Sequence, residues 1–81
     1  MAKFRYNMDD KAAVLEFKKA IMGKVAVMKD SGLELAVGGP GMTVKVTFSK
    51  GVVETKASMF GKMMLGTVDS VLEVTEGFEK I

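Results

Sequence analysis

The alternation of apolar and polar residues between Lys24 and Ser58 is the feature that most constrains the fold. A period of two places successive side chains on opposite faces of a β-strand, so this stretch predicts strands with one buried face. The clearest case is residues 42–48, where Met, Val, Val and Phe alternate with Thr, Lys and Thr. Turn-forming residues divide the stretch at 29–32, 38–41 and 49–51, which leaves four strands. Short turns favour an antiparallel meander with one face towards water.

The residues before this stretch predict a short strand followed by a helix. Phe4 and Tyr6 alternate with charged or polar residues, which is a strand pattern. Over residues ~8–22 the apolar spacing changes to three and four, as on one face of a helix. Asn7 is the expected N-terminal cap, and Gly23 marks the expected end. The apolar face of this helix contains Ala13, Val14, Phe17, Ala20 and Ile21.

A second, methionine-rich helix is predicted over residues ~59–79; its start can lie anywhere from Ser58 to Gly61, and Ser58 is the best cap. Three glycines in this stretch each lower helix propensity by about 1 kcal/mol relative to alanine, which allows a kink or an early end. The apolar face is wider than a lone sheet would cover, and Met63, Leu65 and Leu72 lie at its flanks. Its residues form two series with a spacing of seven: Ala57, Met64, Val71 and Phe78, and Phe60, Thr67, Val74 and Ile81.

These patterns predict a single α+β domain over residues 1–81. A four- or five-stranded antiparallel meander is covered on one face by both helices, in the order strand, helix, four strands, helix. The pattern does not fix the partner of the first strand, and an edge of the meander is one position for it. The predicted core is Phe4, Val14, Phe17, Ile21, Val25, Val27, Leu33, Leu35, Val44, Val46, Phe48, Val53, Met64, Val68, Val71 and Phe78.

The composition excludes several kinds of stabilisation and of site. A chain of 81 residues without cysteine or histidine has no disulfide and no Cys/His zinc site, so packing must stabilise it. The 12 basic and 10 acidic residues are spread along the chain without a run of more than two cations, which disfavours nucleic acid as a partner. No window approaches the ~18 uncharged apolar residues of a membrane span. The N-terminus lacks a secretory signal pattern, so a cytoplasmic location is expected.

Motifs that resemble reactive or binding sites have simpler structural interpretations. The glycine-rich segment 38–41 leads into a strand rather than a helix, so a hairpin connection is favoured over a phosphate loop. Asp9 and Asp10 point about 100° apart on a helix, which favours capping over metal binding. Glu73, Glu76 and Lys80 have the spacing of solvated charge pairs. Without histidine or cysteine a serine nucleophile would need a Lys or carboxylate base, so we expect no enzyme activity and no cofactor.

The methionine cluster is the feature that points beyond the fold. Methionine adapts to varied apolar surfaces and serves both cores and binding grooves. The first hypothesis is a non-enzymatic interaction module that forms a homodimer or binds a protein partner through the second helix. The alternative is a carrier or surface binder of an apolar small molecule, lipid or polymer, held between the sheet and that helix. The candidate residues for either are Met59, Phe60, Met63, Met64, Leu65 and Leu72.

A third hypothesis is a weak nucleic-acid binder that uses the open face of the sheet. Its cations would be Lys3, Arg5, Lys45 and Lys56. Glu34 and Glu54 are expected on the same face and weaken this hypothesis.

The order of the predicted elements resembles that of the putative polyhydroxyalkanoic acid system family. Its small proteins have an opening Met-Ala-Lys strand, a helix, a meander and a late strand that runs into an apolar C-terminal helix. The corresponding stretch here runs from Val44 to Met64, and Tyr6-Asn7-Met8 stands where the family usually has a His-containing segment. The resemblance supports the predicted fold and implies association with storage granules. The family has no assigned catalytic residues to transfer.

Overall fold

The computed structural model describes residues 2–39, 41–58 and 60–81. Within these residues the chain forms two helices and six strands. Their bounds are β1 (Ala2–Tyr6), α1 (Asp10–Ile21), β2 (Ala26–Asp30), β3 (Glu34–Gly39), β4 (Met42–Ser49), β5 (Val52–Ala57), α2 (Lys62–Val74) and β6 (Phe78–Lys80).

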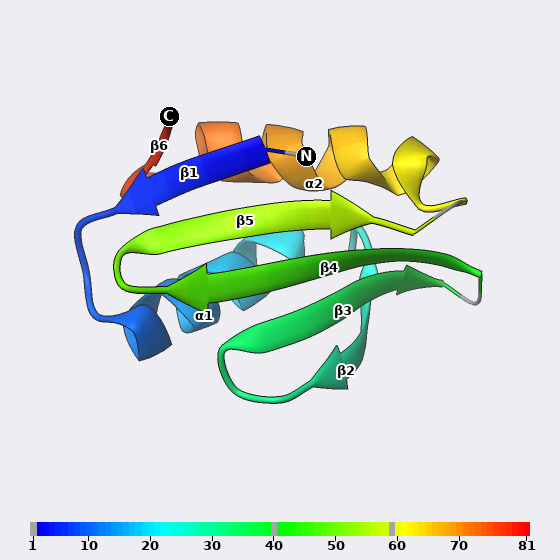
Figure 1. The fold of residues 1–81 in the computed structure, drawn as a ribbon, viewed down its shortest axis with the longest axis horizontal. Coiled ribbons are helices and arrows are strands. Elements are labelled where there is room, and N and C mark those ends of the chain that lie inside the picture. The colour runs from blue at the N-terminus through cyan, green and yellow to red at the C-terminus, as the bar shows by residue number, and fades with distance from the viewer. Residues whose placement is uncertain (1, 40, 59) are drawn as a thin grey trace.

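The strands form an antiparallel sheet in the order β2-β3-β4-β5-β1-β6 (Figure 1). Strands β2 to β5 are the predicted meander, and β1 adds beside β5 with Phe4 opposite Val53. The short strand β6 then pairs with the free side of β1, where Tyr6 lies opposite Phe78. The predicted α+β class is confirmed, whereas the predicted number of four or five strands is wrong because residues 78–80, at the end of the predicted second helix, form the sixth strand β6.

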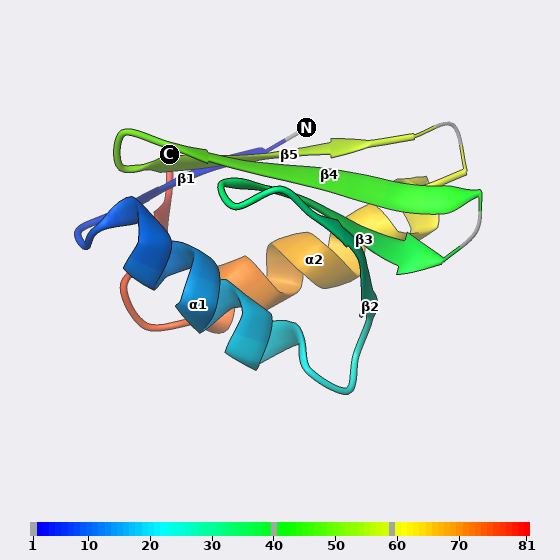
Figure 2. The same ribbon diagram turned by 90° about the horizontal axis from the view of Figure 1, so that it is seen from below.

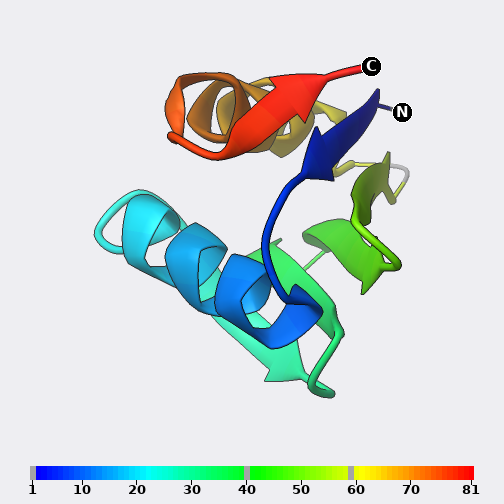
Figure 3. The same ribbon diagram turned by 90° about the vertical axis from the view of Figure 1, so that its left-hand side faces the viewer.

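Both helices cover the same face of the sheet, as predicted (Figure 2). In the end-on view of Figure 3 the helices form one layer and the strands form the other. Apolar side chains of α1 and α2 fill the space between the layers, because each helix presents residues at three- and four-residue spacing to the inward face of the alternating strands.

The helix ends differ from those predicted. Helix α1 begins at Asp10, and its cap is Asp9 rather than Asn7, since the Asp9 carboxylate accepts a 3.2 Å hydrogen bond from the backbone N–H of Lys11. Helix α2 is shorter than residues 59–79. It ends at Val74, and Gly77 then takes a φ of 98°, a left-handed conformation that favours glycine. This turn directs Phe78 back towards β1.

The core lies between the helices and the inward face of the sheet. An aromatic line crosses it, with ring centroids 5.8 Å apart for Phe17 and Phe48, 5.9 Å for Tyr6 and Phe48, and 5.7 Å for Tyr6 and Phe78. These tilted contacts tie α1, β4, β1 and β6 together. The buried apolar residues are Phe4, Tyr6, Ala13, Val14, Phe17, Ile21, Leu35, Val37, Val44, Val46, Phe48, Val53, Val68, Val71, Leu72 and Phe78.

Two members of the predicted core are wrong. Val27 is 40% exposed and Leu33 is 39% exposed. Val27 belongs to β2, an outer strand whose residues are all exposed, and Leu33 lies in the turn between β2 and β3. Val25 and Met64 are half-buried and pack against the core. In the part of the chain that the structure describes, no helix is long and apolar enough to cross a membrane.

Candidate functional site

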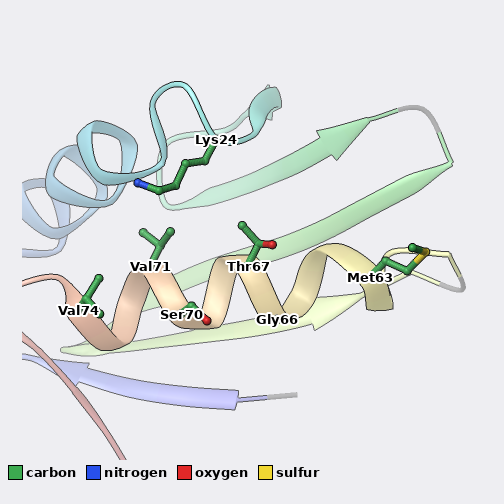
Figure 4. A pocket seen from close by; sticks show the side chains of 7 residues that line it. All are labelled: Lys24, Met63, Gly66, Thr67, Ser70, Val71 and Val74. Carbon is green, nitrogen blue, oxygen red and sulfur yellow. The ribbon is translucent and has the colours of Figure 1, made fainter.

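A strip of uncharged side chains runs along α2 on the side that faces away from the sheet. At about 100° per residue, positions spaced by three and four fall on one side of a helix. We call the set formed by Met63, Gly66, Thr67, Ser70 and Val74 the outer strip. With Lys24 and Val71, these residues line a groove of about 530 Å³ (Figure 4).

Large apolar side chains stand at the two ends of the outer strip, and small residues lie between them (Figure 4). Met63 is 82% exposed and Val74 is 84% exposed. Phe60, just before the helix, is 64% exposed. The fold therefore leaves apolar surface uncovered along the outer side of α2, and contact with another molecule would remove this surface from water.

Charged residues border the outer strip on one side. Lys62, Asp69 and Glu73 fall within about 40° of one another around the helix axis. Glu73 forms an ion pair of 3.5 Å with Lys80 of β6, and both side chains are about half exposed. On the other border, Lys24 extends from the connection between α1 and β2 (Figure 4). The outer strip is therefore an uncharged surface with charged margins.

The structure divides the predicted interface residues into exposed and buried groups. Phe60 and Met63 are exposed, whereas Met64 and Leu65 are half-buried against the core. Met59 lies outside the described residues. Leu72 is fully buried, so its prediction as a surface contact is wrong. The reason is the rotation of α2, which turns Leu72 towards the sheet beside Val68.

The candidate residues named from the sequence omit four members of the outer strip, Gly66, Thr67, Ser70 and Val74, although Thr67 and Val74 belong to one of the seven-residue series of the second helix. Their signal was present, because they follow Met63 at intervals of three and four residues. Gly66, Thr67 and Ser70 are small or hydroxylated, so they add little to the hydrophobic periodicity of the sequence. The strip could therefore be recognised only after the side of α2 that faces the sheet was known.

The space between α2 and the sheet is a packed core. Val68 and Leu72 are fully buried there and belong to the same core as the buried valines of β4 and β5. The buried hydroxyl of Thr55 donates a 2.9 Å hydrogen bond to the carboxylate of Asp69, which joins β5 to α2. An apolar ligand held beneath the helix would have to displace these side chains.

The open face of the sheet carries charges of both signs. Lys3 pairs with Glu54 at 3.7 Å, and Arg5 pairs with Glu79 at 3.0 Å. Lys45 pairs with Glu34 at 3.9 Å and lies opposite Lys56 in the register of β4 and β5. Because acidic partners are interspersed among the four cations proposed for nucleic-acid binding, this face is not a continuous basic patch.

The other motifs take structural positions. Gly39 at the end of β3 is paired with Met42 at the start of antiparallel β4, so the two strands form the predicted hairpin, and Pro40 lies outside the described residues. Asp9 caps α1. The carboxylate of Asp10 accepts hydrogen bonds from Tyr6 and from two backbone N–H groups. Among residues 2–39, 41–58 and 60–81, no three acidic side chains gather as metal ligands would.

A comparison with known protein families, with curated proteins and with solved structures finds no match to this chain. The resemblance to the putative polyhydroxyalkanoic acid system family therefore stays a prediction. Any assignment of function depends on the geometry of the chain itself, and the groove along the uncharged outer strip of α2 is the strongest candidate site.

Proposed function

We propose that this chain is a non-enzymatic interaction module that self-associates or binds a protein partner through the outer strip of α2. The observation that carries the proposal is that Met63 and Val74, at the two ends of the uncharged outer strip, are 82% and 84% exposed. An uncharged helix face with exposed apolar side chains at both ends favours association more than single exposed apolar residues do, since the latter are common on monomers.

The form of the groove supports a helix or strand as the bound element. Small residues at the centre of a helix face allow another backbone to approach closely, and interhelical distances of about 8–10 Å depend on the side chains at the contact. The charged margin formed by Lys62, Asp69 and Glu73 supplies a polar rim around the apolar strip, as in other protein interfaces.

Sedimentation velocity across a concentration series tests this proposal. Met63→Asp and Val74→Lys each place a charge in the outer strip. Each introduced charge interacts favourably with the helix dipole, because Asp is favourable near the start of a helix and Lys near its end. We therefore expect both variants to fold like the wild type, as checked by circular dichroism and thermal melting, and to lose concentration-dependent association.

Leu15 provides the matched controls. It is an apolar residue on α1 with 54% exposure, and it does not line the groove. Leu15→Asp and Leu15→Lys make the same changes in charge and should associate like the wild type. A wild-type chain that sediments as a strict monomer at about 0.5 mM, where even Kd values near 1 mM give detectable association, would contradict self-association through this face.

A further inference from the structure

We infer that the outer strip of α2 binds the same strip of a second copy of this chain, with the two helices antiparallel. This inference depends on the proposed function and identifies its partner. It is carried by two features of α2: exposed apolar residues at both ends of the strip with small residues between them, and a charged margin whose signs match only in the antiparallel direction.

Apart from Gly66, whose counterpart position is the buried Val71, the sizes of the outer-strip residues are arranged symmetrically about the midpoint of the strip. Met63 and Val74 are large and exposed at the ends, and Thr67 and Ser70 are small and lie at equal distances from the centre. A two-fold axis through this midpoint places Met63 of one copy against Val74 of the other, and Thr67 against Ser70. An isologous interface requires such self-complementarity, because the same surface patch serves both subunits.

The charged margin determines which relative direction of the two helices is favoured. Lys62 stands at the start of α2, and Glu73 stands near its end on the same side of the helix. In the antiparallel arrangement Lys62 falls within about 3 Å, along the helix axis, of Glu73 of the second copy. The two-fold axis creates this contact twice. Parallel helices would instead set Lys62 level with Lys62 and Glu73 level with Glu73, so this attraction between opposite charges would be absent.

The contact is expected to be weak and reversible. Helix α2 has 13 residues, and a pair of helices this short buries less than the roughly 1,600 Å² of a standard protein interface. We therefore expect a dissociation constant in the micromolar-to-millimolar range rather than an obligate dimer. Exposed Lys–Glu pairs contribute little to such a dimer individually, but they decide which direction is favoured.

Charge reversal at the two margin positions tests the inference by sedimentation equilibrium at low salt. Lys62→Glu alone brings two glutamates together at both contacts, and Glu73→Lys alone brings two lysines together at both contacts. We expect either change to weaken self-association about tenfold. The double variant Lys62→Glu/Glu73→Lys restores opposite charges and should return to within about threefold of the wild type. An equimolar mixture of the two single variants should associate more tightly than either variant alone.

Two exposed residues of α1 provide matched controls for the change in net charge. Lys19→Glu and Glu16→Lys make the same reversals outside the outer strip and should leave the dissociation constant unchanged. Thermal melting at low concentration checks that each variant is folded, which is needed for Glu73→Lys because it also removes the ion pair with Lys80.

The outcomes separate this inference from the proposed function. Loss in both single variants with recovery in the double variant supports the antiparallel pair. If Met63→Asp abolishes association but the charge reversals have no effect, the outer strip is an interface and the antiparallel pairing is overturned. If the wild type does not associate at all, a second copy is not the partner and the inference is overturned, while binding to another protein chain stays as the proposed function.

Discussion

The hydroxyl of Tyr6 donates a 2.6 Å hydrogen bond to a carboxylate oxygen of Asp10. The same carboxylate accepts hydrogen bonds of 3.2 Å from the backbone N–H groups of Lys50 and Gly51. One side chain at the start of α1 thus joins the end of β1 to the turn between β4 and β5. This contact fixes the position of α1 over the sheet, which in turn places Phe17 against Phe48.

The stability of the protein should fall in acid, and Asp10 should account for part of the fall. The hydrogen bond from Tyr6, followed by those from Gly51 and Lys50, holds the pKa of the Asp10 carboxyl below its usual value. The unfolded chain therefore binds the proton at a higher pH than the folded chain, and the stabilisation present above about pH 4 is lost as the pH falls further. Asp30, whose pKa is also lowered by its bond from Lys18, should contribute in the same direction.

Urea unfolding of the wild type and of Asp10→Asn at about pH 6 and about pH 2 measures the contribution of Asp10. The difference between their midpoints should be large at the higher pH and should shrink at the lower pH. A difference that is the same at both values would contradict a role for the ionised carboxylate.

Removing the Tyr6 hydroxyl should destabilise the fold without disturbing the aromatic line. Tyr6→Phe keeps the ring beside Phe48 and Phe78 but deletes the donor to Asp10. A hydrogen bond to a charged group that stays partly accessible to water should contribute about 1–2 kcal/mol to the free energy of unfolding. Burial is the main cause that raises the pKa of the Tyr6 hydroxyl, so its stabilising effect is present below about pH 10 and lost above it.

Chemical denaturation of Tyr6→Phe at neutral pH and above about pH 10 checks both statements. The variant should unfold at a lower urea concentration than the wild type at neutral pH and should show a smaller loss of stability in alkali. Equal midpoints at neutral pH would mean that water replaces the hydroxyl without cost.

The central strands could be predicted from the sequence, because a strand with one buried face alternates between apolar and polar residues. Residues 42–48 alternate without interruption, and the inward residues Val44, Val46 and Phe48 are all buried. The same alternation cannot show which strand lies at the edge. Val27 has a strand pattern like the others, but β2 is outermost and the residue is 40% exposed. Edge position is decided by the order of strands, which is a tertiary property.

The end of the second helix was missed because helical spacing and strand pairing gave competing interpretations. Phe78 lies seven residues after Val71, as on one face of a helix, yet it belongs to β6 and packs on Tyr6. Pairing with the free side of β1 favours the strand. The candidate site likewise depends on tertiary packing that the sequence pattern does not contain. Its exposed methionine could be predicted, whereas the buried state of Leu72 depends on how α2 is rotated over the sheet.

Leu72 and Met63 should differ sharply in their effect on stability. Leu72 is fully buried, so Leu72→Ala should lower the free energy of unfolding by about 2–5 kcal/mol through lost burial and the cavity left behind. Met63 is 82% exposed, so Met63→Ala should change it by less than about 0.5 kcal/mol. Urea unfolding at a concentration where the protein is monomeric compares the two. Similar losses in both variants would contradict the rotation of α2 described above.

Two glycines near α2 should respond in opposite ways to alanine, because one is enclosed and the other is open. A Cβ at Gly61 would overlap the backbone carbonyl oxygen of Thr43 and lie 3.0 Å from the backbone nitrogen of Ser58. Backbone atoms cannot move aside like a flexible side chain, so Gly61→Ala should destabilise the protein by about 1–3 kcal/mol. A Cβ at Gly66 meets nothing within 4 Å, so Gly66→Ala should stabilise the exposed helix interior by about 0.5–1 kcal/mol.

Thermal melting of both glycine variants at low protein concentration tests this contrast and excludes any effect of association. The melting temperature should fall for Gly61→Ala and rise for Gly66→Ala. A rise for Gly61→Ala would mean that the start of α2 is not seated against β4. A fall for Gly66→Ala in the monomer would mean that its outward side already contacts another part of the same chain. In that case the groove would not be open to a partner, and the surface proposed for association would be lost with it.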